Sequence, residues 1–127
     1  MHGLHPRRFE ELVAELLDRE GFEVQLTPES RDGGKDIYAV QSNALGRFLF
    51  VVECKRYALG KPVGIEFVQR LAGVVDGMRA NAGIIATTSR FTRPAIECQE
   101  RDYRTIISLR DYTHLQQWLN RAARRPT

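Results

Sequence analysis

The sequence predicts an α/β fold, a mixed sheet of five strands with helices on both faces. Three apolar segments near the amino terminus are joined by short turns, which predicts an antiparallel meander. Two further apolar segments each follow an amphipathic segment, which predicts parallel strands reached through right-handed crossovers. The 127 residues have the size of one ordinary domain, and the hydrophobic fraction of 43% suits a globular core. We therefore expect a single domain over residues 1–127, with a few frayed residues at each end.

The expected helices carry apolar side chains at three- and four-residue spacing. Pro6 suits a first turn, Gly21 suits a helix end, and Thr92 and Asp111 suit helix caps. The small residues Gly73 and Gly77 are expected to let one helix lie close to the sheet. The four expected helices are residues 6–20, 64–79, 92–101 and 111–123.

The expected strands are short and rich in apolar residues. A polar turn with two consecutive glycines, 28–34, separates the first two strands, and a loop at 41–46 separates the next two. The five expected strands are residues 22–27, 35–40, 48–56, 83–88 and 105–109.

The run F-L-F-V-V-E-C-K-R, residues 48–56, is the segment around which the chain is expected to be organised. Its five consecutive apolar residues predict a strand buried on both faces, because a half-exposed strand would alternate. Side chains alternate across a strand, so Glu53 and Lys55 share one face while Cys54 points to the other. Two opposite charges at the end of a buried strand are costly unless they pair or bind a ligand.

Asp36 begins another expected strand, directly after the sequence D-G-G-K. We hypothesise that Asp36, Glu53 and Lys55 form a magnesium-dependent nuclease site. Mg²⁺ prefers oxygen ligands and retains some of its waters, and a bound metal generates a nucleophile from water. Lys55 would orient that water or neutralise charge on the phosphate. The alternative from physics alone is a structural ion pair between Glu53 and Lys55 at a sheet edge.

The motifs F-E-E-L-V-A-E-L-L, G-F-E-V, D-G-G-K-D-I, V-E-C-K-R and G-I-I-A-T-T-S-R-F-T follow one another along the chain. In this order and spacing the sequence resembles the Mrr-like restriction endonucleases of the PD-(D/E)xK nuclease superfamily, from about residue 9 to residue 115. The resemblance implies a restriction-endonuclease-like three-layer fold and a metal-dependent DNA endonuclease.

The resemblance also implies roles for single residues. Asp36 and Glu53 become the metal ligands and Lys55 the catalytic lysine. The glutamate that the family carries on its first helix matches Glu10, with Glu11 as the second choice. Many Mrr-like members have glutamine where this chain has Glu53, so the acid fits the wider superfamily pattern better.

Several polar residues flank the expected site and are candidates for phosphate contacts, which position DNA without reading bases. For each of them a solvated surface position is the alternative; Thr92 is as readily a helix cap, and Tyr57 and Phe91 either stack or pack. The candidates are Gln69, Lys35, Arg56, Arg90 and Ser89, with Arg31, Lys61 and Thr88 as further neighbours.

Composition indicates which partners and which cellular compartment to expect. The net charge of +3 is compatible with a polyanion. No signal peptide and no apolar run long enough to span a bilayer is visible, so a cytoplasmic location and no membrane partner are expected. Cys54 and Cys98 are expected to be buried free thiols, and the three histidines lack the spacing of a zinc site.

The function predicted from the sequence is therefore an endodeoxyribonuclease that uses Mg²⁺, with Mn²⁺ as a substitute, and whose partner is DNA. Two alternatives stay open: a Holliday-junction-resolvase-like nuclease, and a non-catalytic DNA-binding or assembly module that kept the fold. A homodimer would suit the cutting of both strands. No residues remain to build a recognition domain, so the chain is expected to be an excised domain, a small stand-alone nuclease, or a nuclease that recognises DNA structure.

Overall fold

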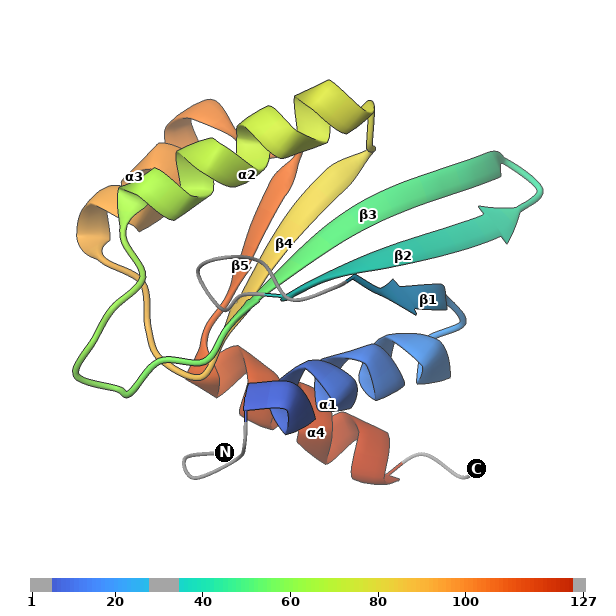
Figure 1. Cartoon of the computed structure of the whole chain (residues 1–127), viewed down its shortest axis with the longest axis horizontal. Helices are drawn as coiled ribbons and strands as arrows, with labels where there is room; N and C mark the ends of the chain where they lie inside the picture. The colour runs from blue at the N-terminus through green and yellow to red at the C-terminus, as the bar shows by residue number, and fades with distance from the viewer. Residues whose placement is uncertain (1–5, 28–34, 125–127) are drawn as a thin grey trace.

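The computed structural model describes residues 6–27 and 35–124 of the chain. In this part a five-stranded sheet, with strand order β1-β2-β3-β4-β5, is sandwiched between helices. Helices α2 and α3 cover one face of the sheet, and α1 and α4 cover the other (Figure 1). The elements are α1 (Pro6–Arg19), β1 (Glu23–Leu26), β2 (Lys35–Asn43), β3 (Gly46–Lys55), α2 (Ile65–Met78), β4 (Ala82–Thr87), α3 (Arg93–Asp102), β5 (Ile107–Arg110) and α4 (Tyr112–Arg124).

The strand pairing confirms the predicted mixed sheet. Strands β1, β2 and β3 form an antiparallel meander, whereas β3, β4 and β5 are parallel. The carboxyl ends of the three parallel strands therefore meet at one edge of the sheet, where Lys55, Thr87 and Arg110 are the last strand residues. Polar side chains at this edge come from segments far apart in the sequence.

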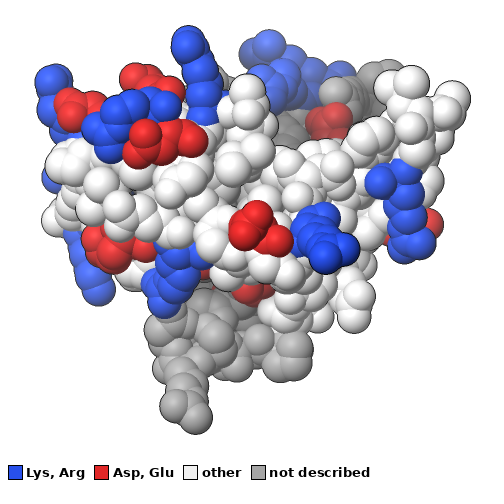
Figure 2. Space-filling model, turned by 90° about the horizontal axis from the view of Figure 1, so that it is seen from above, with Lys and Arg blue, Asp and Glu red and all other residues white. Residues whose placement is uncertain are grey.

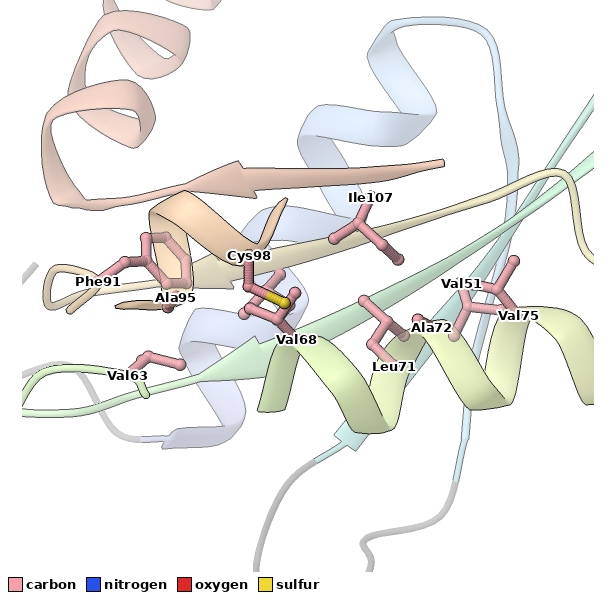
Figure 3. Close-up of a cluster of buried hydrophobic side chains, with 11 residues drawn as sticks. Val51, Val63, Val68, Leu71, Ala72, Val75, Phe91, Ala95, Cys98 and Ile107 are labelled. Carbon is pink, nitrogen blue, oxygen red and sulfur yellow. The ribbon is translucent and has the colours of Figure 1, made fainter. Parts of the chain in front are cut away.

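Each face of the sheet has its own apolar core. The core under α2 and α3, which we call the α2 cluster, is shown in Figure 3, where side chains of both helices meet the central strands. The buried members of the α2 cluster are Val51, Val63, Val68, Leu71, Ala72, Val75, Ile85, Phe91, Ala95, Cys98 and Ile107. Burying one side chain such as Leu71 contributes about 1.5–3 kcal/mol, so the α2 cluster anchors both helices to the sheet.

The other core, which we call the α1 cluster, lies between the sheet and helices α1 and α4. Its members include residues of β3 that alternate with those of the α2 cluster, because successive strand side chains point to opposite faces. The buried members are Phe9, Val13, Ala14, Leu17, Ile37, Ala39, Val52, Cys54, Ala86 and Leu115. Cys54 thus lies on the face opposite to Val51. Both cysteines are buried and free, as predicted.

The central strand is buried on both faces over only part of its length. Its carboxyl half, including Val51 and Val52, is buried, whereas Phe48, Leu49 and Phe50 are half-buried. The amino half lies in the β2–β3 hairpin, which extends past the helices (Figure 1). The predicted burial is therefore right for the end that carries Glu53 and Lys55, and too extensive for the other end.

The predicted loop 41–46 is mostly strand. The ladder continues to the pair of Asn43 with Gly46, and only a two-residue turn remains. Gly46 has φ of 137°, which favours glycine, and the Asn43 side chain accepts a hydrogen bond from Leu45 N at 2.8 Å. Polar side chains on this projecting hairpin face solvent, so their polarity did not indicate a loop.

The two helix glycines do not have the predicted role. A Cβ added at Gly73 or Gly77 would meet no heavy atom within 4 Å, so neither lies against the sheet. The close approach is on the strand side instead, at Gly83 of β4, where an added Cβ would lie 2.9 Å from side-chain atoms of Leu71 and Val75. Glycine is therefore required in the sheet below α2, and not in α2 itself.

The predicted helix ends at Gly21 and Thr92 are confirmed. Gly21 has φ of 98° after the end of α1, and the Thr92 hydroxyl accepts a hydrogen bond from Ala95 N at 3.2 Å as the N-cap of α3. Before α4, the Asp111 carboxylate accepts the backbone N–H of His114 at 3.1 Å. The predicted turn 28–34 and the chain ends lie outside the described residues. Within residues 6–27 and 35–124, no helix combines the length and apolar character needed to cross a bilayer.

Candidate active site

Strands β2 and β3 bring two of the predicted acids together. Asp36 and Glu53 are direct partners in the antiparallel register, so their side chains share one face. Directly opposed residues of such a pair have Cβ atoms about 4.5–5.5 Å apart. The neighbouring pair Tyr38–Val51 points to the same face and belongs to the α2 side of the sheet. Residues 17 positions apart in sequence thus converge because the hairpin folds back on itself.

Lys55 lies beside these acids and is nearly inaccessible. Its side chain is 5% exposed, and its Nζ lies 3.7 Å from Oε2 of Glu53, whose side chain is 13% exposed. This separation is that of an ion pair and is longer than a hydrogen bond. The ion pair considered as the alternative therefore exists, on the central strand and at the carboxyl edge of the sheet.

An aromatic ring from α2 covers the lysine. The Lys55 ammonium lies 4.4 Å from the ring centroid of Phe67, within cation–π distance. Tyr57 packs edge-on against Phe67 with ring centroids 6.3 Å apart, and the guanidinium of Arg70 lies 4.9 Å from the centroid of Phe67. Phe67 was not singled out from the sequence. It directly precedes the buried Val68 on α2, so it read as an ordinary helix residue.

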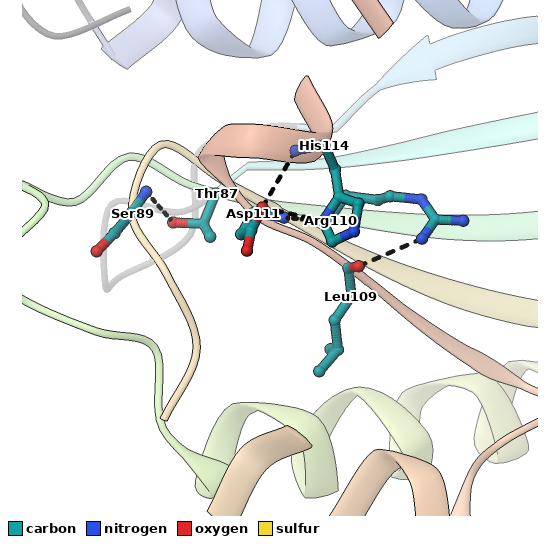
Figure 4. A network of polar contacts seen from close by, with 6 residues as sticks. All are labelled: Thr87, Ser89, Leu109, Arg110, Asp111 and His114. Atoms are coloured by element: carbon teal, nitrogen blue, oxygen red, sulfur yellow. Dashed lines mark hydrogen bonds and ion pairs between the residues drawn. The ribbon is translucent and has the colours of Figure 1, made fainter. Parts of the chain in front are cut away.

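Hydroxyl groups fix the chain just beyond Lys55. The Thr87 hydroxyl donates to the carbonyl of Lys55 at 2.7 Å, and the Thr88 hydroxyl donates to the carbonyl of Tyr57 at 2.8 Å. Thr87 also accepts the backbone N–H of Ser89 (Figure 4). The ends of β3 and β4 are therefore bound to each other, which holds Lys55 in place.

Ser89 requires a correction. It was predicted as a phosphate contact, but it is fully buried and its hydroxyl donates to the carbonyl of Lys61 at 2.8 Å. Thr88 is also buried, and Thr92 caps α3. These hydroxyls tie the two loops beyond β3 and β4 together, so Ser89 does not face a ligand.

Glu10 is buried on α1, with 5% of its surface exposed. Its negative charge acts on the nearby thiol of Cys54. The pKa of this thiol is raised well above its ordinary value, first by burial and then by the charges of Glu10, Asp36 and Glu53. All three carboxylates therefore lie close enough to Cys54 for their charges to act on its thiol. Glu10 approaches from the α1 side, whereas Asp36 and Glu53 lie on the α2 side. Glu11, the second choice, is exposed.

Among the described residues, no three His, Cys, Asp or Glu side chains form a group that could hold a metal ion by themselves. Asp36 and Glu53 instead form a facing pair, and Glu10 is a further buried acid on α1.

The remaining predicted phosphate contacts are surface positions. Gln69, Arg56, Arg90 and Lys61 are exposed, and Lys61 lies 4.4 Å from the ring centroid of Tyr57. Seen from the side of α2 and α3, positive and negative side chains are interspersed and form no single basic surface (Figure 2). Arg31 and the side chain of Lys35 lie outside what the structure describes.

Solved structures with the same architecture define the class to which this fold belongs. The DNA modification-dependent restriction endonuclease AspBHI superposes with a TM-score of 0.74 at 24% identity, over 94% of this chain and 32% of that one. The MspJI restriction endonuclease, solved with a 27-mer oligonucleotide, gives 0.59 at 20% identity, over 89% of this chain and 26% of that one. The fold is therefore that of restriction endonucleases.

The sequence supplies the family. Residues 1–119 match the Mrr_cat family of restriction endonucleases, and the chain belongs to this family. The uncharacterized protein y4cE of Sinorhizobium fredii (strain NBRC 101917 / NGR234) is 34% identical over 92 residues, which are 72% of this chain and 23% of that protein. The chain thus spans about a quarter to a third of the length of these relatives. The predicted resemblance and fold class are confirmed.

Proposed function

We propose that this domain hydrolyses phosphodiester bonds in DNA with the help of Mg²⁺, at a site formed by Asp36, Glu53 and Lys55. One observation carries the proposal: two carboxylates face each other across β2 and β3, with an ammonium group 3.7 Å from one of them. Membership in a family of restriction endonucleases supports the same chemistry.

The donor set suits a hard divalent cation. Mg²⁺ is usually held by one or two carboxylates, while waters and substrate phosphate complete its octahedron. Asp36 and Glu53 would hold it, and Mn²⁺ would be accepted by the same oxygen ligands. When bound, the ion would lower the pKa of a water molecule and supply the nucleophile.

The protein side chains have separate tasks in this proposal. Lys55 would donate hydrogen bonds to the phosphate oxygens, whose negative charge grows during in-line displacement. Its burial strengthens this interaction because little water competes with it. Phe67 would hold the ammonium in place through its ring face. Glu10 would add negative charge near the same strand end.

DNA would be positioned by polar side chains around the site. Arg56, Arg90 and Gln69 are exposed and flank it in sequence, and Lys35 adjoins Asp36. Contacts of this kind weaken as salt concentration rises, since cations are released from the DNA.

Plasmid cleavage tests the proposal. Wild-type protein is expected to nick or cut DNA with Mg²⁺ and to bind without cutting in Ca²⁺. Asp36→Ala and Lys55→Ala should each lower cleavage by about 10²-fold or more and keep DNA binding. Asp76→Ala is the matched control, because Asp76 is an exposed carboxylate on α2. Tight binding without cleavage in any divalent metal would instead identify a non-catalytic DNA-binding module.

The wider setting of the domain is also a proposal. The relatives are about three times as long as this chain, so we propose that sequence or modification recognition resides in a separate domain or subunit. A two-fold pair of these domains would cut both strands. The buried free thiols of Cys54 and Cys98 suit a reducing, cytoplasmic compartment.

A further inference from the structure

A second polar site lies on the other face of the sheet, between the end of β5 and helix α4. It is a pocket of about 260 Å³ lined by Arg110, His114, Gln117, Trp118 and Arg121. Four of these residues recur at spacings of three and four along α4, so they form one stripe of the helix. Arg110 is the last residue of β5 and closes the pocket from the sheet.

The lining groups suit a ligand with a phosphate and a flat ring. Two guanidinium groups offer paired N–H donors that match phosphate oxygens, and an indole offers a face on which a base can stack. Gln117 adds an amide that can accept and donate hydrogen bonds. The volume of the pocket lies just below the range of drug-sized pockets. A pocket of this size suits a ligand of about one nucleotide.

Neighbouring contacts leave these groups available to a ligand. The Trp118 Nε1 donates to Glu20 at 3.4 Å, which occupies the edge of the indole and not its face. Arg110 makes one long hydrogen bond, 3.4 Å to the carbonyl of Leu109, and a guanidinium has five N–H donors. Nδ1 of His114 accepts the backbone N–H of Asp111 at 3.1 Å (Figure 4), so Nε2 is the ring nitrogen left for a ligand.

The strand register relates this pocket to the candidate active site. Arg110 pairs with Ala86, which pairs with Cys54, so two strand spacings of about 4.8 Å separate Arg110 from β3. Cys54 lies between Glu53 and Lys55 along β3. The backbone of Arg110 therefore lies about 10 Å from β3 within the sheet, at the same edge as the candidate active site, and the pocket is on the opposite face.

We propose that this pocket binds a single deoxynucleotide unit, with its phosphate between Arg110 and Arg121 and its base on Trp118. The unit would come either from a DNA strand that runs past the carboxyl edge or from a free mononucleotide. The first source rests on the proposed nuclease function, whereas the second does not.

Trp118 is the only tryptophan of the chain, so its fluorescence reports directly on the pocket. The experiment titrates the protein, without divalent metal, with deoxyadenosine 5′-monophosphate and separately with a short single-stranded oligodeoxynucleotide. Quenching by at least one of them is expected. Quenching by the oligonucleotide alone assigns the pocket to a DNA strand, and quenching by the mononucleotide assigns it to the free nucleotide.

Arginine variants make the assignment specific. Arg110→Ala and Arg121→Ala should each weaken binding about tenfold, as expected when a charged hydrogen bond is lost. Arg124→Ala is the matched control, because Arg124 is exposed on the same helix and does not line the pocket. Both lining arginines are exposed, so their removal should leave the thermal unfolding temperature unchanged.

The proposal is overturned if neither probe changes the fluorescence, or if the change is as strong in Arg110→Ala and Arg121→Ala as in wild type. It can fail independently of the nuclease function. Plasmid cleavage without quenching would refute only the proposed nucleotide pocket. Quenching that depends on the arginines, without plasmid cleavage, would refute only the proposed nuclease function.

Discussion

The two polar sites of this domain are built in opposite ways. The candidate active site joins Asp36, Glu53 and Lys55 from two strands in a largely buried place. The pocket on α4 takes four of its five side chains from one helix face, and most of them are exposed. Buried charges depend strongly on their partners, whereas exposed charges are solvated by water. Substitutions in the first site should thus affect both chemistry and stability, and those in the second only binding.

The largest difference is expected in catalysis. Lys55→Ala should lower the cleavage rate by about 10²–10³-fold, because a preorganised donor for the transition state is lost. Arg121→Ala should leave this rate unchanged, because weaker DNA binding does not limit cleavage at saturating protein. Single-turnover cleavage at saturating protein measures both. Equal losses in the two variants would show that the two sites do not differ in the way we infer.

The next largest effect is expected where α2 packs against the sheet. Gly83→Ala should destabilise the domain by about 1–3 kcal/mol, because the new methyl group would lie 2.9 Å from Leu71 and Val75. Gly73→Ala is the control and should stabilise by about 0.5–1 kcal/mol, since alanine favours a helix and the position is open. Urea unfolding measures both changes, and a neutral Gly83→Ala would contradict the close packing.

The pH dependence of stability tests whether the charges of the three carboxylates act on Cys54. Burial, followed by the charges of Glu10, Asp36 and Glu53, raises the thiol pKa in the folded state. The unfolded chain then releases this proton before the folded one, so stability is fully present below the unfolded pKa and falls as pH rises above about 9. The loss should approach about 1.4 kcal/mol per pH unit.

Unfolding of wild type and Cys54→Ala across this alkaline range checks the prediction. The variant should lose less stability with rising pH. Cys98→Ala, which removes the buried cysteine of the other core, is the comparison. Parallel curves for wild type and Cys54→Ala would count against the assigned shift.

The smallest effect is expected at Phe67. Phe67→Leu removes a cation–π contact worth about 0.5–2 kcal/mol and should lower kcat several-fold with little change in KM. Phe67→Tyr should restore kcat, because its ring can hold the ammonium equally well. A loss that the tyrosine does not rescue would show that Phe67 acts only by packing.

Most of the architecture followed from local patterns. The order of helices and strands was predicted correctly from helix periodicity, caps such as Thr92 and short apolar segments. The pairing of the five strands was predicted correctly as well. Errors arose where a residue's neighbours decided its role. Gly73 resembled a packing glycine but is exposed. Gly83 lies beneath α2, and the sequence does not show which residue of the strand this helix covers. Ser89 resembled a phosphate contact, but its partners come from a loop 28 residues earlier.

The sequence by itself determined that Glu53 and Lys55 share a face, because side chains alternate along any strand. It likewise contained the stripe of α4 that lines the pocket, since helical spacing brings such residues together. Only the tertiary structure decided that Asp36 stands opposite Glu53, that Phe67 covers Lys55, and that Arg110 closes the pocket. Those contacts join separate segments, and pairing register and helix docking, which no local pattern encodes, set their geometry.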